Sequence, residues 1–265
     1  MNLYQAHIGL TTRCNLNCSH CYSRNERERY CEIDIELDDL ERIFKKLKKL
    51  QTFKVIFAYA ESLLYKDFFN ALLMAKKYGF DIEITSNSIL LSANVIAKIK
   101  DCGVDKIQLS LDYPDIRHDV FRDYQGLFNR VKEALLQLKI IGGFRVKILS
   151  TRLSDDLEFY KKFQEIADEY GIDVVAFLSS EKVSCKSKED IEKVITLLSR
   201  DERFSFHSPY LTPDKCFVGK IMHINPKGDF TLCPLSSKIV GNIFDIDDIK
   251  LSEIYKQSKK LACIL

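Results

Sequence analysis

Apolar and polar positions follow two different rhythms along the first 200 residues of the chain. Short apolar runs are typical of buried strands, and longer stretches with an apolar residue at every third or fourth position are typical of helices. The predicted strands cover residues 6–11, 54–58, 81–86, 106–111, 145–149 and 173–178. The predicted helices cover residues 38–50, 67–78, 92–102, 128–141, 157–170 and 188–199. Strand and helix therefore alternate regularly along this part of the chain.

This alternation predicts an α/β fold. A strand, a helix and a further strand in succession form a parallel sheet with right-handed crossovers, which curl the sheet toward a barrel. The six predicted units are fewer than the eight of a closed barrel, so we expect an open, partial (β/α)6 TIM barrel over residues 1–200. In such barrels the site lies at the carboxyl ends of the strands.

The rhythm stops near Arg200, and the remainder of the chain has another pattern. Two short apolar runs, at 221–224 and 229–232, flank a turn that contains Pro226 and Gly228. Proline and glycine in that order favour a tight turn, so a β-hairpin is predicted. A helix is predicted over 251–260. We expect a small α+β domain over residues 201–265.

Composition and charge narrow the choice of partners. Apolar residues make up 46% of the 265 positions, which is enough for a sizeable core. The 40 basic and 38 acidic residues give a net charge of +2 without a long run of like charges, so a nucleic-acid partner is not expected. No stretch approaches the roughly 18 apolar residues of a membrane span, so no membrane partner is expected.

The cysteines indicate the compartment. There are nine of them, an odd number, and the sequence MNLYQ leads into the first strand without the basic flank and apolar core of a secretory signal. Both features favour metal ligation in a reducing compartment over a disulfide framework. We therefore expect a cytoplasmic protein.

Three cysteines follow the first predicted strand directly, with the spacing C-x3-C-x2-C: Cys14, Cys18 and Cys21. Zinc sites usually have four protein ligands, whereas three cysteines can hold three irons of a [4Fe-4S] cluster and leave the fourth iron open for chemistry. The alternative is a set of buried structural cysteines or a disulfide. Asparagine and serine between the thiols favour an exposed loop, and therefore a ligand role.

This loop, with the aromatic residue His20 before its last cysteine and Tyr22 after it, resembles the signature of the radical S-adenosylmethionine (SAM) enzymes. The resemblance implies that the open iron binds the amino and carboxylate groups of SAM. The reduced cluster then cleaves SAM to a 5'-deoxyadenosyl radical. The three cysteines would be the catalytic cluster ligands, His20 and Tyr22 would lie beside the cofactor, and a flavodoxin or ferredoxin would supply electrons.

A second motif follows the second predicted strand. Tyr59-Ala60-Glu61-Ser62-Leu63-Leu64 resembles the Gly-Gly-Glu-Pro-Leu-Leu stretch of the family, which holds the amino group of SAM. Glycines permit close approach of backbone to a ligand. Their replacement by Tyr59 and Ala60 predicts either a shifted loop or a different SAM pose, and Glu61 alone could also be a solvated loop carboxylate.

Further motifs follow the third, fourth and fifth predicted strands. The resemblance implies SAM contacts from Ser86 and Asn87, which match a Thr-Asn-Gly motif, and from Ser110 and Asp112, which match a Ser-Leu-Asp motif. His118-Asp119-Val120-Phe121-Arg122 fits the His-Asp-x-x-Arg that follows, and we include Arg122 in the cofactor site. Arg152 could pair with the SAM carboxylate. The alternatives are ordinary helix caps and an exposed surface arginine.

The cysteines beyond residue 200 form another pattern. Cys216, Gly228 and Cys233 give C-x11-G-x4-C, and Cys263 follows the last predicted helix. This resembles the SPASM or shorter Twitch extension, which carries an auxiliary [4Fe-4S] cluster. A fourth ligand could be Cys31, Cys185, an oxygen or nitrogen side chain, the substrate or the carboxyl terminus. A zinc knuckle or inert thiols are the alternative.

The sequence as a whole is therefore interpreted as a radical SAM enzyme of the Twitch type. Relatives of this kind modify ribosomally made peptides, through crosslinks, thioethers or epimerisation, or dehydrogenate small sugars and alcohols. We favour a peptide substrate, with a separate peptide-recognition protein as a possible partner. A catalytically silent iron–sulfur protein that carries electrons or scaffolds a partner is the third hypothesis, against which the retained Glu61 and Asp112 argue.

Overall fold

The structure is a computed structural model that describes residues 3–29, 32–154, 156–178, 188–198, 200–207, 221–233 and 238–258. Two compact units can be distinguished by their internal contacts. The first unit contains residues 1–85, 98–105 and 217–265, and the second contains residues 86–97 and 106–216. This grouping follows contacts in space, and the division of the chain near residue 200 stays a prediction.

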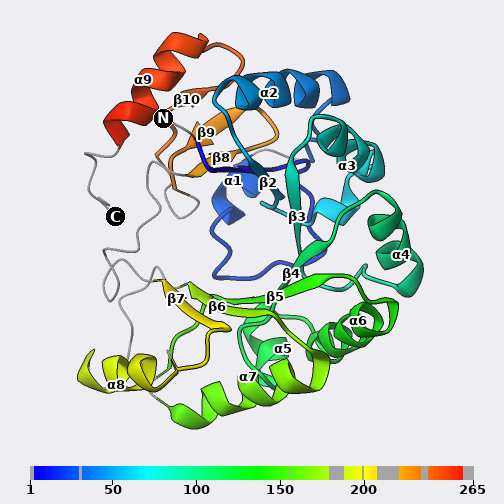
Figure 1. The fold of residues 1–265 in the computed structure, drawn as a ribbon, viewed down its shortest axis with the longest axis vertical. Helices are drawn as coiled ribbons and strands as arrows, with labels where there is room; N and C mark the ends of the chain where they lie inside the picture. The colour runs from blue at the N-terminus through cyan, green and yellow to red at the C-terminus, as the bar shows by residue number, and fades with distance from the viewer. Residues whose placement is uncertain are drawn as a thin grey trace. The chain divides into compact units, whose positions relative to one another are not determined.

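The first unit is built on strands in the order β10-β9-β8-β1-β2-β3 (Figure 1). Their bounds are β1 Gln5–Ile8, β2 Lys54–Phe57, β3 Asp81–Ser86, β8 Ile221–Ile224, β9 Asp229–Thr231 and β10 Gly241–Asn242. The strands β8, β1, β2 and β3 are parallel, and β9 and β10 continue the sheet in antiparallel pairs. The hairpin that the sequence predicted therefore adds directly to the sheet beside the first strand.

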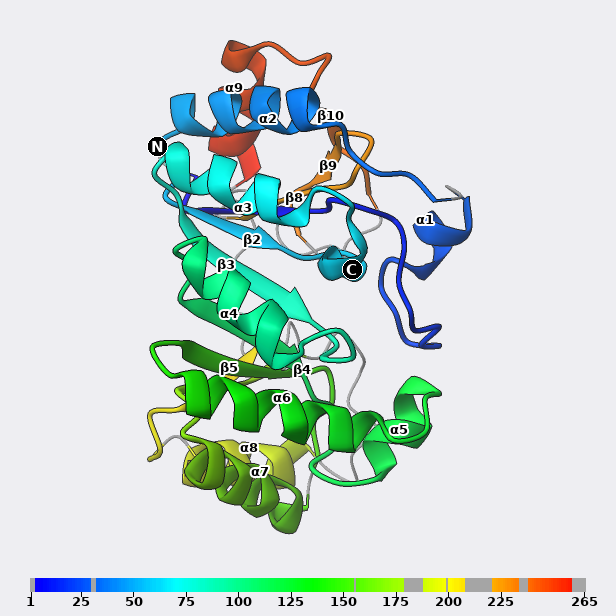
Figure 2. The same ribbon diagram turned by 90° about the vertical axis from the view of Figure 1, so that its right-hand side faces the viewer.

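The described helices of the first unit are α1 Arg24–Arg29, α2 Leu37–Lys49, the 3-10 helix η1 Ser62–Leu64, α3 Phe68–Lys77 and α9 Asp248–Ser258. Figures 1 and 2 show α2 and α3 side by side along β1 and β2. Leu40, Ile43, Phe44 and Leu47 of α2 are buried, and Lys46 on the same helix donates to the carbonyl of Ile243 at 2.6 Å. The chain's last described segment is thereby attached to α2.

The second unit has four parallel strands in the order β4-β5-β6-β7. The strands are β4 Lys106–Ser110, β5 Arg145–Ser150, β6 Val174–Leu178 and β7 Phe204–His207. The helices here are α5 Arg117–Arg122, α6 Leu127–Ile141, α7 Leu157–Tyr170 and α8 Lys188–Leu198, while α4 Ala93–Asp101 has residues in both units. Aromatic rings form much of the core, with Phe177 stacked on Phe206 at 5.2 Å and set edge-on to Phe163 at 5.2 Å.

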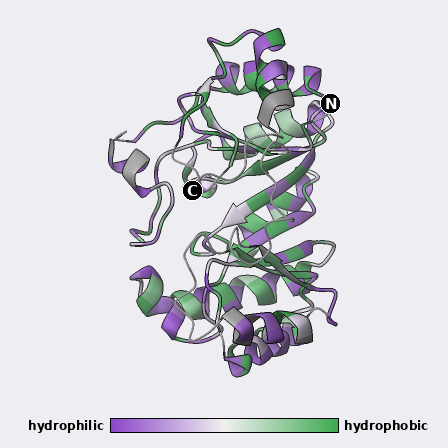
Figure 3. Cartoon of the chain, turned by 90° about the vertical axis from the view of Figure 1, so that its left-hand side faces the viewer, coloured by the Kyte–Doolittle hydropathy of each residue, from purple (hydrophilic) through white to green (hydrophobic). Residues whose placement is uncertain are grey.

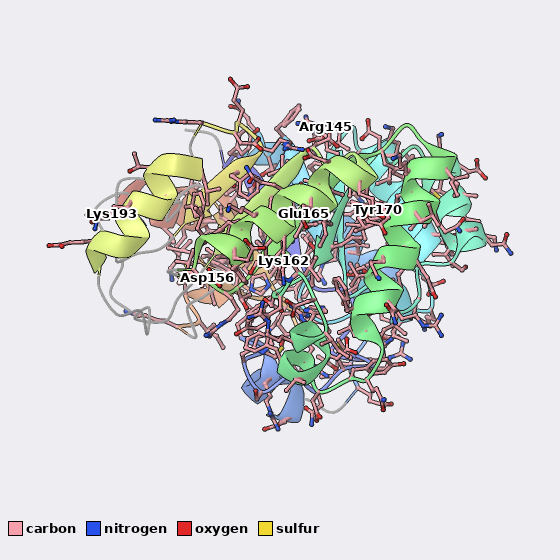
Figure 4. All side chains as sticks on the ribbon, turned by 90° about the horizontal axis from the view of Figure 1, so that it is seen from below. Arg145, Asp156, Lys162, Glu165, Tyr170 and Lys193 are labelled. Atoms are coloured by element: carbon pink, nitrogen blue, oxygen red, sulfur yellow. The ribbon has the colours of Figure 1, made fainter. Side chains whose placement is uncertain are left out.

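Polar and apolar residues are distributed as this layering requires. Figure 3 shows the strands mostly in the apolar colour and the helices with polar outer sides. Figure 4 shows Lys162 and Glu165 on the outer side of α7, whereas Phe159, Phe163 and Ile166 of the same helix are buried. No helix in the described residues is both long and apolar enough to cross a lipid bilayer.

The predicted fold class is confirmed, since the chain has an α/β fold with a parallel sheet. Five elements of the described residues were not predicted from the sequence: α1, η1, α5, β7 and β10. Strand β7 lies at the point where the strand–helix rhythm was expected to end, and the short helix α5 covers the His118 to Arg122 motif.

Candidate functional site

The three-cysteine loop leaves β1 and lies in the first unit. Cys18 is buried, Cys14 and Cys21 are half-buried, and all three carry reduced thiols. The amide of Cys21 donates to the carbonyl of Cys18 at 3.2 Å, which closes a tight turn between the last two cysteines. Burial raises the pKa of the Cys14 thiol to about 11. A metal or another positive group is therefore needed for Cys14 to act as a thiolate at neutral pH.

Two polar residues after the last cysteine contact its sulfur. Ser23 Oγ lies 3.2 Å from Cys21 Sγ and donates to the carbonyl of Tyr59 at 3.1 Å. The guanidinium of Arg27, on α1, lies 3.8 Å from the same sulfur through Nη1. The sequence analysis identified neither residue, because the motif ends at Tyr22 and both contacts depend on how the loop folds back.

The loop after β2 has a glycine-like backbone at Tyr59, where the family's motif has a glycine. Tyr59 has φ of +128°, a value that glycine adopts readily and that is strained for tyrosine. Glu61 is 1% exposed, its amide donates to the carbonyl of Arg13 at 3.1 Å, and its carboxylate accepts from the amide of Leu63 at 3.4 Å. Glu61 is thus a buried, positioned carboxylate rather than a solvated one, and Ala60 lies between it and Tyr59.

A group of aromatic side chains lies beside this loop in the first unit. His223 of β8 contacts the rings of Tyr22 and Tyr59 at 5.6 Å each, and its ring is 6.1 Å from that of His7 on β1. Burial and the neighbouring His7 lower the pKa of His223 to about 3, so it is neutral at physiological pH. The sequence analysis did not identify His223 as a site residue, because it lies beside Tyr22 and Tyr59 only through the parallel pairing of β8 with β1.

The motif after β3 forms a compact polar turn. Ser86 Oγ accepts from the amide of Ser88 at 3.1 Å, and Asn87 Oδ1 accepts from the amide of Ile89 at 3.1 Å. Ser88 stands where the family's Thr-Asn-Gly has glycine, and its φ of +77° is again in the left-handed region. Ser88 Oγ is buried, with no hydrogen-bond partner among the described residues.

Asp112 is the most completely enclosed charge of the second unit. It is 0% exposed, and its Oδ2 accepts from Arg122 Nε at 2.6 Å. Its Oδ1 accepts from the amide and the hydroxyl of Thr151, at 2.8 and 2.6 Å. Burial alone would raise the pKa of Asp112, but Arg122, His118 and the bonds from Thr151 outweigh it and lower the pKa to about 2. The carboxylate is therefore ionised at neutral pH.

The neighbouring motif residues hold this carboxylate in place. The ring of His118 accepts from the amide of Asp112 at 3.1 Å, and Ser150 Oγ donates to its carbonyl at 3.3 Å. Asp119 accepts from the amides of Gly126 and Phe128 at 2.6 and 2.7 Å, at the start of α6. The His-Asp-x-x-Arg run thus folds into an enclosed polar network within the second unit.

These strand-end motifs occur within a single family match. The sequence matches the family described as the Radical SAM superfamily over residues 8–153, from β1 to the residues after β5. The chain belongs to the radical SAM superfamily. It is therefore an enzyme, and the family implies a [4Fe-4S] cluster and SAM as cofactors.

Similar proteins agree with this assignment. An uncharacterized protein of Methanocaldococcus jannaschii is 25% identical over an alignment of 272 residues. The alignment covers 93% of this chain and 91% of that protein. A probable GTP 3',8-cyclase of Methanocella arvoryzae is 26% identical over 85% of this chain, which spans 65% of the cyclase.

Solved structures of radical SAM enzymes have the same fold. SuiB of Streptococcus suis, bound to precursor peptide SuiA, superposes with a TM-score of 0.74 at 18% identity over 96% of this chain and 64% of the SuiB chain. The enzyme anSMEcpe with bound AdoMet gives a TM-score of 0.72 at 17% identity, over 94% of this chain and 80% of its own. At these identities the similarity establishes the α/β fold and its parallel sheet.

The donors of the radical SAM loop fit an iron–sulfur cluster in number and in chemistry. Three thiols lie in one short loop, and thiolates are the usual ligands of such clusters. Arg24 and Arg27, on the following helix, interact electrostatically with these sulfurs, and Arg27 favours the charged form of Cys14. In the described part of the chain, no three His, Cys, Asp or Glu side chains meet closely enough to share a single metal ion.

Three predicted cofactor residues of the radical SAM region remain: His20, which is half-buried in the cysteine loop, and two residues at or just after the ends of β4 and β5. Ser110 is half-buried as the last residue of β4. Arg152 is half-buried, its amide donates to Ser150 Oγ at 3.1 Å, and its guanidinium carbon lies 5.3 Å from the centre of the Phe121 ring. Arg152 is therefore not a free surface arginine, because its side chain packs against an aromatic ring of its own unit.

One of the three cysteines predicted for the auxiliary site falls in the described residues. Cys233 follows β9, is half-buried, and its carbonyl accepts from Thr231 Oγ1 at 2.7 Å. Gly228 of the same motif has φ of +85°, and a Cβ there would lie 2.4 Å from the Phe244 ring, so only glycine fits. Cys216 and Cys263, with the possible ligands Cys31 and Cys185, lie outside the described residues.

Proposed function

We propose that this radical SAM enzyme modifies a peptide by abstracting hydrogen from one of its carbon atoms. The observation that carries the proposal is the three-thiol loop, placed after β1 in a fold that superposes on SuiB over 96% of this chain. SuiB was solved with its precursor peptide SuiA, and anSMEcpe was solved with the Kp18Cys peptide. Both neighbours are thus peptide-binding radical SAM enzymes with this architecture.

The residues of the first unit would bind the cluster and one end of SAM. Cys14, Cys18 and Cys21 would each ligate one iron of the [4Fe-4S] cluster. The open iron supplies the reductive cleavage of SAM that yields the 5'-deoxyadenosyl radical. Glu61, buried and held by its backbone, would accept a hydrogen bond from the amino group of SAM, next to the carbonyl of Ala60. His20 and Tyr22 would lie against the cofactor from the loop itself.

The polar turns of the second unit carry the other residues that we predict to contact SAM. Ser86 and Asn87 follow β3, and we add Ser88, whose buried hydroxyl lacks a partner among the described residues. Ser110 and the Asp112–Arg122 pair would orient the ribose and the methionyl part. Arg152 would meet the carboxylate of SAM in a charge-assisted pair. The short Asp112–Arg122 bond makes this pair a rigid support, since neither partner has to be ordered when SAM binds.

The auxiliary site and the partners complete the proposal. Cys216, Cys233 and Cys263 would hold a second [4Fe-4S] cluster, in a Twitch-like extension over residues 201–265 that follows the barrel of residues 1–200. A flavodoxin or ferredoxin would deliver electrons, and a separate protein would present the peptide. These oxygen-sensitive cofactors, together with the odd number of cysteines, favour a cytoplasmic location.

Peptide modification can be tested directly with short peptides encoded by reading frames next to the gene. Each peptide is incubated anaerobically with reduced protein and SAM, in water and in deuterium oxide. A crosslink or thioether should remove the mass of two hydrogen atoms from one peptide, and an epimerisation should add one deuterium without another mass change. Unchanged peptides, together with 5'-deoxyadenosine formation that rises with a sugar or an alcohol, would contradict the peptide proposal.

A small-molecule substrate is the second candidate function. The observation in its favour is the match to a probable GTP 3',8-cyclase, which extends over 85% of this chain. In that case the reaction would be a dehydrogenation or a rearrangement of a small metabolite. The deuterium-oxide experiment separates the two candidate functions, because only a peptide substrate would show a change in the mass of the peptide.

A further inference from the structure

Arg27 makes three contacts with the cysteine loop, and each uses a different nitrogen of its guanidinium. Nε donates to the carbonyl of Thr12 at 3.1 Å, and Nη2 donates to the carbonyl of Leu16 at 3.3 Å. Nη1 lies 3.8 Å from Cys21 Sγ, within the range of a hydrogen bond to sulfur. Thr12 precedes Cys14, and Leu16 lies between Cys14 and Cys18. One planar group therefore holds the beginning, the middle and the end of the loop.

The location of Arg27 in the chain makes this clamp local. Arg27 belongs to α1, which begins three residues after Cys21, and its amide donates to the carbonyl of Ser23 at 2.9 Å. The first turn of the helix thus brings the side chain back over the loop that precedes it. A lysine at this position could contact one of the three acceptors but not all three, because its ammonium is a single point charge on a flexible stem.

A cation that donates to a cluster sulfur also changes the electronic properties of the cluster. Hydrogen bonds and positive charge at the ligating sulfur stabilise the reduced, more negative state, and so raise the reduction potential. Arg42, on α2 of the same unit, serves as an internal comparison. Its Nη1 pairs with Asp39 at 2.7 Å, with side chains 55% and 39% exposed, so its guanidinium faces a surface carboxylate instead of a sulfur.

From this geometry we infer that Arg27 is a positioning residue of the radical SAM cluster, which fixes the cysteine loop and raises the reduction potential of the cluster. The inference rests on the proposed cluster in the Cys14–Cys21 loop. It is independent of which substrate the enzyme modifies, because both effects exist without substrate.

The experiment compares the reconstituted wild type with the Arg27→Met, Arg27→Lys and Arg42→Met variants. The midpoint potential is measured without substrate, in a redox titration followed by electron paramagnetic resonance. The signal that changes when SAM is added identifies the radical SAM cluster. Arg27→Met should have a lower potential than the wild type and should lose iron to a chelator about 10–100-fold faster, the usual effect of removing an outer-shell partner. The potential of Arg27→Lys should lie between those of the wild type and Arg27→Met, and Arg42→Met should have the potential of the wild type.

An Arg27→Met variant with the potential of the wild type would overturn the inference. If Arg27→Met retains no iron, the Arg27→Lys variant provides the test. The inference would be overturned if Arg27→Lys had the same potential and the same rate of iron loss as the wild type. If the Cys14, Cys18 and Cys21 triple variant retained the SAM-responsive signal, the proposed cluster site itself would be wrong. That outcome is distinct from a failure of the Arg27 inference.

Discussion

Gly9 and Tyr59 lie so close together that a methyl group on Gly9 would come within 3.0 Å of the Cβ and Cγ atoms of Tyr59. Gly9 follows β1, and Tyr59 occupies the place of a glycine in the family's motif after β2. The tyrosine keeps a glycine-like backbone with φ of +128°, and its ring packs against His223. The bulky Tyr59 in the motif after β2 is thus accommodated because Gly9, directly after β1, has no side chain.

This relationship predicts an energetic coupling between the two positions. Gly9→Ala should destabilise the wild type by about 1–3 kcal/mol, the usual cost of overpacking. In a Tyr59→Gly background the same substitution should cost less, with a coupling energy of roughly 0.5–3 kcal/mol. Chemical denaturation of the four proteins measures the cycle. Gly9→Ala combined with Tyr4→Gly is the control, since Tyr4 is 57% exposed, and there the effects should add.

The Asp112–Arg122 pair leads to a prediction about stability. Arg122→Met would remove the ion-pair partner of the fully buried Asp112 and should destabilise the protein by about 3–5 kcal/mol. Arg117→Met is the matched control on the same helix, because Arg117 pairs with Asp115 at the surface, with side chains 52% and 26% exposed. The control should change the free energy of unfolding by no more than about 1 kcal/mol. Equal effects of the two variants would contradict the special role of the buried pair.

The low pKa of Asp112 predicts a pH dependence of that stability. Since its pKa falls from 3.8 to about 2 on folding, the ionised carboxylate contributes stability above pH 3.8. This contribution should disappear as the pH falls through the window between these two values. Unfolding followed at a series of pH values should therefore show a steeper loss of stability in the wild type than in Asp112→Asn, which cannot titrate. If stability fell equally with pH in the wild type and in Asp112→Asn, Asp112 would be excluded as the source of the pH dependence.

The auxiliary cluster makes a prediction about iron content. If Cys216, Cys233 and Cys263 ligate a second cluster, alanine at Cys14, Cys18 and Cys21 together should leave roughly four irons per chain. The wild type should then contain about eight. A triple variant without iron, or a wild type with only about four, would show that the carboxyl-terminal cysteines do not form a cluster site. Zinc in place of the missing iron would identify a structural zinc site instead.

Much of the fold could be predicted from the sequence because its strands and helices are regular and strongly periodic. The run after Gly79 became β3 with the expected bounds, and the run before Cys14 became β1, which begins one residue earlier and ends three residues earlier than expected. Strand β7 was missed because its four residues, Phe204–His207, directly precede a proline-containing segment and resemble a linker.

The candidate site was only partly predictable, because several of its contacts depend on segments that are distant along the chain. His223 reaches Tyr22 and Tyr59 only because β8 pairs in parallel with β1, a pairing that no local pattern indicates. Arg27 belongs to a charged run, RNERER, in which nothing distinguishes it from Arg24 or Arg29. Its role becomes visible only when the loop is folded and three acceptors meet one guanidinium.

The most direct test of the account is the formation of 5'-deoxyadenosine by the anaerobically reconstituted, reduced protein in the presence of SAM. The wild type should form it, and Cys18→Ala should not, because one iron would lose its thiolate. Cys102→Ala is the matched control: Cys102 is 8% exposed, follows α4 and belongs to no cysteine motif, so this variant should retain the activity. A wild type with a full cluster complement that forms no 5'-deoxyadenosine, even with cell extract as a source of substrate, would contradict the assignment of radical SAM chemistry to this chain.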